Sequence, residues 1–189
     1  MKQTHYFIAV PMAAEVKKQI AQWKEQIAFA FPFRTWVHEE DYHITLAFLG
    51  HVPQAKVEEV REKMAEVAVR HTPFSLSLSE IRTFGDRTAP RILWQGVEKE
   101  EKLWVLQRDV YTACTDIGFS LDKRPFTPHI TIARKWQGSE AFRLEELKQK
   151  PRIAATFSVR EIVLYQTHLD RTPKYEAIAS FPFSEKATS

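Results

Sequence analysis

The chain has 189 residues, of which 44% are hydrophobic and 27% charged, and its 27 Lys and Arg against 24 Asp and Glu give a net charge of +3. This composition is typical of a globular protein of one domain or two small lobes, and only 5 glycines exclude a flexible linker protein or a Gly-rich nucleotide binder. The mild positive charge suits a polyanionic partner without requiring one, a single cysteine excludes an internal disulfide, and no apolar run reaches the ~18 residues that span a membrane.

The N-terminal segment predicts a buried strand followed by an amphipathic helix. Residues 6–10 (YFIAV) form a short apolar run ended by Pro11, which is typical of a buried strand. Because this apolar part is brief and passes directly into a helical pattern, we expect no signal peptide and a cytoplasmic protein. Residues 13–28 carry the single apolar stripe of a helix, formed by Val16, Ile20, Trp23 and Ile27.

The stretch up to residue 97 predicts three strands and a helix. Residues 31–41 (FPFRTWVHEED) break the helical pattern and are expected to form a loop, whereas residues 43–50 (HITLAFLG) are expected to form a strand. Residues 74–81 alternate between apolar and polar side chains, as a half-buried strand does, and residues 91–97 form a further strand. Pro53 opens the helix, whose apolar side carries Val57, Val60, Met64 and Val67.

The remainder predicts a helix that ends at Gly118, a strand entered through two prolines, a charged helical piece and two closing strands. Cys114 falls in the first of these helices, where a buried small hydrophobic residue is expected. The strands cover residues 125–134, 156–167 and 174–183, and the charged helical piece covers residues 141–148.

These elements predict an α+β fold, because about seven strands and three or four helices are interspersed without strict alternation. Largely antiparallel sheets follow from that order. We expect one domain over residues 1–183 and a frayed C-terminal tail over residues 184–189.

A repeated tetrapeptide is the strongest functional signal. The sequence HITL at residues 43–46 returns as HITI at residues 129–132. Side chains on a strand alternate between two faces, so each copy would turn its histidine and threonine toward an opening and its aliphatic residues toward the core. The same alternation directs Phe48 into the core.

Two histidines across a cleft can act as an acid and a base near neutral pH. Between His43 and His129, a phosphodiester could be attacked in line, one imidazole taking a proton and the other giving one. Thr45 and Thr131 could donate hydrogen bonds to its non-bridging oxygens. Arg134 is the nearest candidate to stabilise negative charge, but strand alternation places it on the face opposite to His129.

Other interpretations of these histidines are a structural role and a metal site. A single histidine on a strand is more often structural than catalytic, but the pairing favours catalysis. No carboxylate or third ligand has suitable spacing, so we expect no metal and no cofactor. Five further histidines lack a matching context and are expected to be structural or on the surface: His5, His38, His51, His71 and His168.

With these motifs and their flanks, the sequence resembles the 2H (two-histidine) phosphoesterase superfamily, and more closely its RNA 2',3'-cyclic phosphodiesterase family, long called 2'-5' RNA ligases. The resemblance covers almost the whole chain, and the two histidine blocks are its most specific parts. The matching segments are FIAVP, WVHEEDYHITLAFLGHV, RILWQGV, RPFTPHITIAR, EIVLYQTHL and KYEAIASFPF.

The resemblance implies a bilobal fold, in which two pseudo-symmetric lobes of largely antiparallel sheet with outer helices surround a central cleft. It also implies metal-independent hydrolysis of a 2',3'-cyclic phosphate to a 2'-phosphomonoester. His43 would be the general acid that protonates the departing O3', and His129 the general base that activates water. Thr45 and Thr131 would hold the phosphate, and Arg134 would contribute charge.

An RNA substrate requires contacts beyond the phosphate. Aromatic rings can stack on bases, and arginines near the motif blocks can meet backbone phosphates. The aromatic candidates for substrate binding are Phe33, Trp36, Phe48 and Tyr165. The arginine candidates are Arg34, Arg124 and Arg134.

Three interpretations of the function stay open from the sequence. The first is an enzyme acting on RNA ends or on a small cyclic nucleotide, as a monomer. The second is a module that binds RNA ends or nucleotides without turnover. The third is 2'-5' ligation, which the same residues would perform as the reverse reaction, although water at its usual concentration favours hydrolysis.

Overall fold

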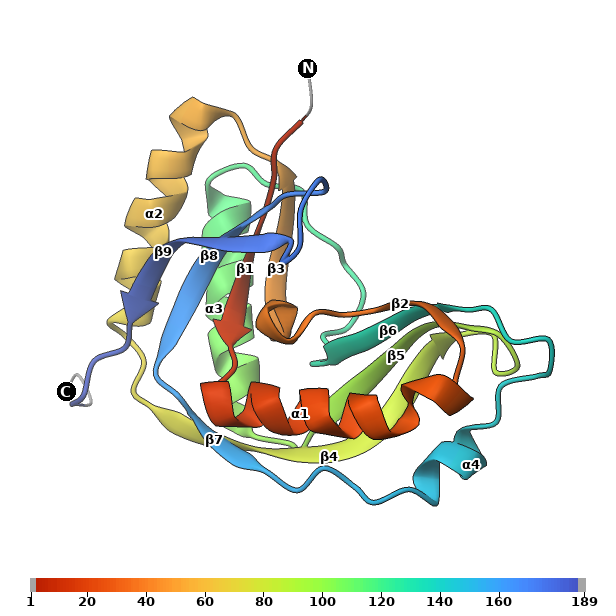
Figure 1. Cartoon of the computed structure of the whole chain (residues 1–189). Coiled ribbons are helices and arrows are strands. Elements are labelled where there is room, and N and C mark those ends of the chain that lie inside the picture. Colours follow the sequence, from red (N-terminus) through yellow and green to blue (C-terminus); the bar gives the residue numbers. More distant parts are fainter. Residues whose placement is uncertain (1–2, 187–189) are drawn as a thin grey trace.

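Two antiparallel sheets form the body of the structure, a computed structural model that describes residues 3–186 (Figure 1). Residues 1–2 and 187–189 lie outside the described part, so half of the expected tail at residues 184–189 is not described. At the beginning of this tail, the amide of Ser184 donates a 2.9 Å hydrogen bond to the carbonyl oxygen of His71. The single domain expected over residues 1–183 stays a prediction.

The sheets contain four and five strands. The four-stranded sheet has the order β3 (His43–His51), β1 (His5–Pro11), β8 (Glu161–Thr167) and β9 (Tyr175–Pro182). The five-stranded sheet has the order β2 (Phe33–Trp36), β6 (Ile130–Trp136), β5 (Pro90–Val97), β4 (Phe74–Gly85) and β7 (Thr156–Val159). All paired strands run antiparallel.

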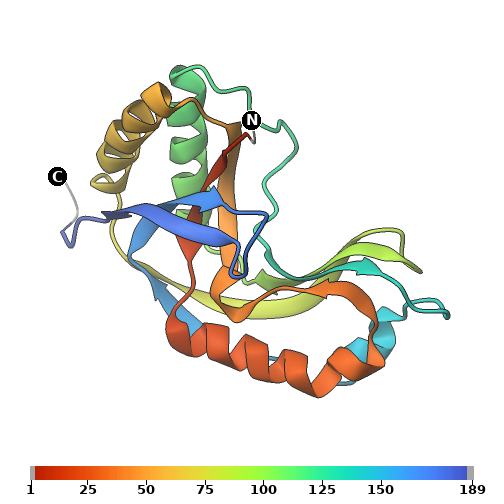
Figure 2. The same cartoon turned by 45° about the horizontal axis from the view of Figure 1, so that its top comes forward.

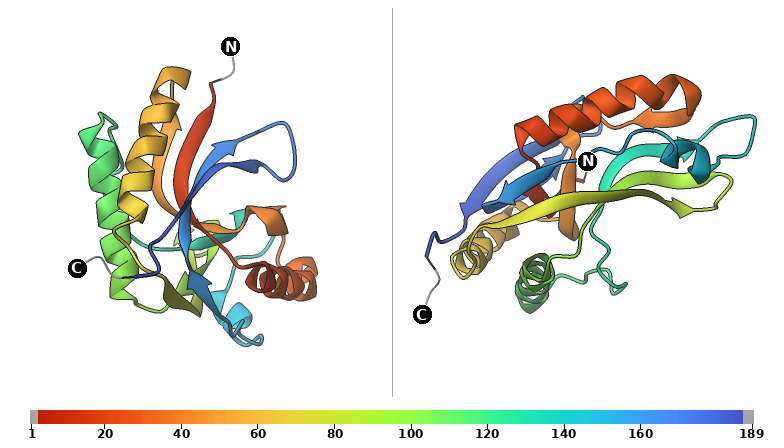
Figure 3. Two further views of the ribbon diagram at one scale, coloured as in Figure 1. Left: turned by 90° about the vertical axis from the view of Figure 1, so that its left-hand side faces the viewer. Right: turned by 90° about the horizontal axis from the view of Figure 1, so that it is seen from below.

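Helices cover the outer side of each sheet. α2 and α3 lie side by side against the four-stranded sheet, and α1 lies across the five-stranded sheet (Figures 2 and 3). No helix within residues 3–186 is long and apolar enough to cross a membrane. The helices are α1 (Ala14–Ile27), α2 (Gln54–Ala68), α3 (Glu101–Asp116) and α4 (Leu144–Lys148), with short 3-10 helices η1 (Ala28–Ala30) and η2 (Glu39–Asp41).

This arrangement confirms the predicted α+β class with two lobes of antiparallel sheet. The predicted apolar stripes are the buried faces of α1 and α2. Buried side chains from both sheets and from α1, α2 and α3 belong to one continuous hydrophobic core. The two lobes therefore share their interior.

The end of α3 follows from its sequence. Gly118 has a φ of +100°, a conformation that is strained for residues with a side chain. Its amide donates to the carbonyl of Thr115, and the amide of Phe119 donates to that of Cys114, so that two free carbonyls of the last turn are bonded. As predicted, Cys114 is fully buried, and burial raises the pKa of its thiol to about 12.

The predicted loop at residues 31–41 is wrong in part, because Phe33–Trp36 form β2 at the edge of the five-stranded sheet. This strand pairs only with β6 on one side, and it follows Pro32 directly. Four residues are too few for an alternating pattern to be distinguished from a loop.

The strand predicted over residues 156–167 is also wrong, because it is two strands in different sheets. The chain leaves the five-stranded sheet after β7 and enters the four-stranded sheet at β8, with Arg160 between them. Only two charged residues, Arg160 and Glu161, separate the apolar residues of the two strands, and so short an interruption does not distinguish two strands from one. The helix predicted over residues 141–148 is shorter than expected, and the strand predicted from residue 125 begins only at Ile130, after two prolines that lack an amide hydrogen.

We predict that Leu106→Ala destabilises the protein by about 2–5 kcal/mol, because this fully buried side chain of α3 would leave a cavity in the shared core. Urea unfolding followed by circular dichroism measures the change. Arg108→Ala, at an exposed position of the same helix, is the matched control and should change the free energy of unfolding by less than about 0.5 kcal/mol. Equal effects of both variants would contradict the described packing of α3.

Candidate active site

The two H-x-T segments meet where the two sheets come together. His43 is the first residue of β3, His129 directly precedes β6, and these strands contact each other (Figure 1). A positive charge on His129 lowers the pKa of His43, and the charge of Arg134 lowers the pKa of both histidines. Oγ1 of Thr45 lies 3.0 Å from Nε2 of His43, and Thr45 lines the same pocket as His129. The two imidazoles therefore border one cleft, and Arg134 lies within electrostatic range of both.

A β-bulge in β3 sets the direction of its side chains. Consecutive residues of β1 pair with Thr45 and Ala47, which leaves Leu46 as an extra residue. Leu46 and Ala47 are therefore both buried, and the alternation resumes one residue late. The prediction that Phe48 lies in the core is wrong for this reason: its side chain is 56% exposed.

The same bulge occurs in β6. Consecutive residues of β5 pair with Thr131 and Ala133, which leaves Ile132 as the extra residue. Ile132 and Ala133 are both fully buried, and Arg134 is half-buried. The bulge thus returns Arg134 to the face of His129, although simple alternation placed it on the opposite face.

The repeat therefore extends over six residues, HITLAF at 43–48 and HITIAR at 129–134. Each copy has its bulge at the fourth position, and its sixth residue returns to the face of the histidine. Phe48 and Arg134 hold equivalent places in the two halves. One half supplies an aromatic ring and the other a guanidinium.

The imidazole of His43 is held at both nitrogens. Its Nδ1 lies 2.8 Å from the carbonyl oxygen of Asp41, and since a carbonyl only accepts, Nδ1 carries the proton. In the neutral ring Nε2 then accepts a hydrogen bond of 3.0 Å from Oγ1 of Thr45. Three aromatic rings surround the imidazole, with centroid distances of 4.8 Å for Phe7, 5.1 Å for Tyr175 and 5.9 Å for Tyr165.

The imidazole of His129 is oriented in the same way. Its Nδ1 donates to the carbonyl oxygen of Thr127 at 2.7 Å, so Nε2 is the nitrogen that can exchange protons in the cleft. Phe84 and Trp94 approach the ring with their centroids at 5.1 and 5.8 Å. In both halves, the carbonyl two residues before the histidine fixes the tautomer.

Burial is the main cause that lowers the pKa of both imidazoles. For His43, burial outweighs the bond to the Asp41 carbonyl, and the charges of His129 and Arg134 lower the pKa further, to about 4. For His129, burial and the charge of Arg134 lower the pKa, while the bond to Thr127 opposes them. Both rings are therefore mainly neutral at pH 7 in the free protein.

An open pocket of about 550 Å³ adjoins His129. The loop before β6, α3 and the β4–β5 hairpin enclose it, and Thr45 and Phe48 line it from β3. Its polar rim includes Arg91 and Arg124. This volume is in the range that small-molecule sites require.

A family model described as LigT like Phosphoesterase matches residues 10–94 and 96–175. The chain belongs to the LigT-like phosphoesterase family. It is 59% identical over 182 residues to the RNA 2',3'-cyclic phosphodiesterase of Geobacillus stearothermophilus, covering 96% of this chain and 58% of that protein. It is 37% identical over 183 residues to the RNA 2',3'-cyclic phosphodiesterase of Bacillus subtilis (strain 168), covering 95% and 97%. The chain thus spans less than two thirds of the Geobacillus relative and nearly all of the Bacillus one.

Solved structures of this family have the same fold. Escherichia coli LigT complexed with 3'-AMP matches with a TM-score of 0.79 at 24% identity, covering 96% of this chain and 99% of that one. A structure described as a phosphoesterase matches with a TM-score of 0.78 at 26% identity, covering 97% and 99%. The resemblance inferred from the sequence, to the 2H phosphoesterases, is confirmed.

The structure does not bring every candidate residue to the cleft. Tyr165 lies near His43 and stacks on Phe7, and burial raises the pKa of its hydroxyl to about 12. Phe33 is buried in the core, so the expectation that it stacks on a base is wrong. Trp36 packs against Phe33 at 5.6 Å and does not line the pocket described above.

The arginine candidates differ in their surroundings. Arg124 lies on the pocket rim, where its Nε donates to the carboxylate of Asp122 at 2.9 Å. Arg34 is exposed on β2. Of the three, Arg134 is the one whose charge lowers the pKa of both histidines.

Sequence reasoning missed the aromatic walls of both half-sites and the buried carboxylate of Asp41. The aromatic rings that were missed come from β1, β4, β5 and β9, outside the two histidine segments. Asp41 stands two residues before His43, and Thr127 stands two residues before His129. This equal spacing is the sequence feature that could have pointed to Asp41. Within residues 3–186, no group of three or more His, Cys, Asp or Glu side chains could hold a metal ion, and the metal-free reaction stays a prediction.

We predict that Arg134→Met raises the pKa of both His43 and His129, because a positive charge that disfavours their protonated forms is removed. Titration of ¹⁵N-histidine-labelled protein by NMR measures both values. Arg34→Met, on the neighbouring strand β2, is the matched control and should leave both unchanged. A shift of only one histidine in Arg134→Met would contradict the shared cleft.

Proposed function

We propose that this chain hydrolyses 2',3'-cyclic phosphate ends of RNA to 2'-phosphomonoesters by acid–base catalysis without a metal. The observation that carries the proposal is the pair of oriented imidazoles, His43 and His129, of which His129 and the hydroxyl partner of His43, Thr45, line one pocket. The names of the Geobacillus and Bacillus relatives support the same reaction.

In the proposed reaction, a water molecule attacks phosphorus while His129 Nε2 takes its proton. The bond from phosphorus to O3' breaks, and His43 Nε2 gives a proton to the departing O3'. The ester to O2' stays intact, so the product is a 2'-phosphomonoester. Proton exchange with solvent returns both imidazoles to their starting states.

The cleft would also stabilise the charge that develops on phosphorus. Thr45 and Thr131 provide hydroxyl donors, one from each strand, and Arg134 provides a permanent positive charge. The anionic substrate has a second effect. Its negative charge between the imidazoles favours their protonated forms, so binding would raise the lowered pKa of His43 and supply the acid with its proton.

The pocket beside His129 would hold the nucleoside part of the RNA end. Phe48 offers an exposed ring and Phe84 a half-buried one, and Arg91 lies on the rim. Aromatic rings bind bases of any sequence by stacking, which suits an enzyme that recognises a type of end. We further propose that the protein acts as a monomer in the cytoplasm.

We predict that His43→Ala and His129→Ala each lower kcat by ~10²–10⁴-fold on an oligoribonucleotide with a 2',3'-cyclic phosphate end. Chromatography that separates 2'- from 3'-phosphate products measures turnover and its direction. His51→Ala, at the exposed end of the same strand β3, is the control and should be fully active. Circular dichroism verifies that all three variants fold.

The two roles are separated by a diester whose leaving group is p-nitrophenolate, which departs without a proton. On this substrate His43→Ala should lose much less activity than His129→Ala, because only the acid becomes dispensable. The reverse order would exchange the roles, and near-normal turnover by either variant on RNA would refute the pair. Loss of wild-type activity with EDTA would indicate a metal, and binding without conversion would support a module without turnover.

We predict that Phe48→Leu raises KM for a nucleoside 2',3'-cyclic phosphate by the equivalent of ~1–3 kcal/mol, because the flat ring is lost while apolar contact remains. kcat should change little, since Phe48 contacts neither transferred proton. Phe29→Leu is the matched control: this ring is 87% exposed at η1, and its loss should leave KM unchanged. An unaltered KM in Phe48→Leu would exclude the ring from base binding.

A further inference from the structure

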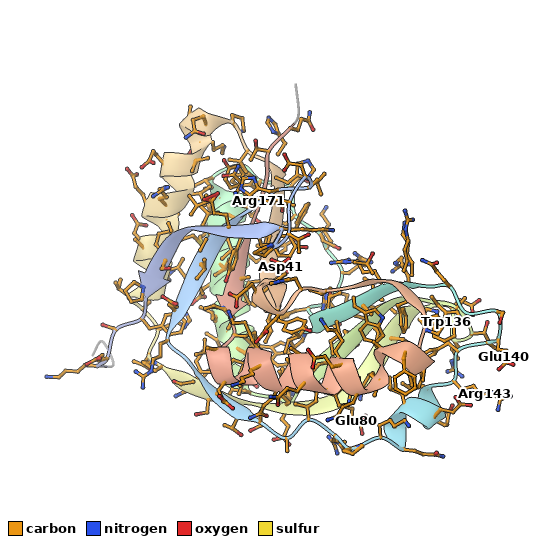
Figure 4. The ribbon with its side chains drawn as sticks, viewed as in Figure 1. Asp41, Glu80, Trp136, Glu140, Arg143 and Arg171 are labelled. Carbon is orange, nitrogen blue, oxygen red and sulfur yellow. The ribbon has the colours of Figure 1, made fainter. Side chains whose placement is uncertain are left out.

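Asp41 is a buried carboxylate that the proposed reaction does not use. It is 5% exposed and ends η2, with one residue between it and the start of β3 (Figure 4). Its Oδ2 accepts a hydrogen bond of 2.9 Å from the amide of Lys174, and its Oδ1 accepts one of 3.1 Å from the amide of Tyr175. These two amides stand at the start of β9, 133 and 134 residues further along the chain.

The main chain of Asp41 makes a third contact, to the imidazole of His43. Its carbonyl oxygen accepts the bond from Nδ1 at 2.8 Å and thereby selects the tautomer that leaves Nε2 for proton transfer. One residue therefore connects the imidazole to β9. A carboxylate buried this deeply is costly unless it is bonded, so its two amide partners fix the position of the whole residue.

The carboxylate also holds the residue whose aromatic ring packs against His43. The ring of Tyr175 meets the imidazole edge to face at 5.1 Å, and the amide of this tyrosine is one of the two that Asp41 holds. Asp41 thus restrains His43 from two sides. Its carbonyl fixes Nδ1, and its carboxylate fixes the residue that packs against the ring.

We propose that Asp41 is a positioning residue that sets the orientation and tautomer of His43 by anchoring η2 to the start of β9. The kinetic consequence rests on the proposed function, whereas the geometric one does not. In the other half, the carbonyl of Thr127 orients His129 from a loop that lines the open pocket. The residues that orient His43 are thus anchored to the four-stranded sheet, whereas the loop that orients His129 lines the pocket proposed to hold the substrate.

The pKa of His43 depends on the charges around it, so a change at Asp41 can be measured as a change in this pKa. The negative charge of Asp41 raises the pKa of His43, whereas burial and the charges of His129 and Arg134 lower it. Tyr175 and Tyr165 face the ring from β9 and β8. Loss of the carboxylate should therefore lower the pKa of His43 further.

The test compares Asp41→Ala and Asp41→Asn with the wild type. We expect Asp41→Ala to lower kcat by ~10²-fold with KM within twofold, because a displaced imidazole transfers protons poorly while the pocket is unchanged. ¹⁵N NMR of labelled histidine should show the Nδ1–H tautomer of His43 losing population. Asp41→Asn keeps one acceptor oxygen without the charge, so it should recover part of kcat and lower the pKa of His43.

Asp86→Ala is the matched control, since this exposed carboxylate also accepts a backbone amide, that of Thr88, in the β4–β5 hairpin. It should leave kcat and the His43 spectrum unchanged. Folded Asp41→Ala with wild-type kcat and an unaltered tautomer would overturn the proposal. If Asp41→Ala does not fold, an unaltered pKa and tautomer in Asp41→Asn would overturn it. If the wild type hydrolyses no cyclic phosphate, the proposed function fails, and the His43 spectra still decide the role of Asp41.

Discussion

One extra residue in each of two strands determines how this cleft is built. The bulges at Leu46 and Ile132 bury two consecutive aliphatic residues and return the next side chain to the face of the histidine. Without them, Arg134 would lie on the far side of the sheet from the phosphate it is proposed to bind. The direction of Arg134 thus depends on a local change of backbone pairing, and both halves have this change at the same position.

The halves share a backbone but differ in their surroundings. His43 lies among Phe7, Tyr165 and Tyr175, so its half-site is closed by aromatic side chains. His129 borders a pocket of about 550 Å³. Pseudo-symmetric strands therefore supply equivalent imidazoles, and the different residues around them make the two halves of the cleft unequal.

The sequence predicted that the two histidine segments lie close together, because the repeated tetrapeptide is local and visible. It could not predict the direction of Phe48 or Arg134, because a bulge has no marker in the pattern of apolar residues. It also missed β2, which is too short for periodicity, and the change of sheet at Arg160, where only two charged residues separate the apolar residues of β7 and β8. The role of Asp41 depends on contacts with β9, and such distant pairings are set by the tertiary fold.

The chain passes from one sheet to the other at Arg160, and this passage is one of several. The chain also changes sheet between β1 and β2, between β2 and β3, and between β3 and β4. Neither sheet is made from one continuous piece of polypeptide. A single proteolytic cut anywhere between β1 and β8 yields no fragment that holds the complete four-stranded sheet. The two lobes are interwoven, so their association persists in any intact chain that folds.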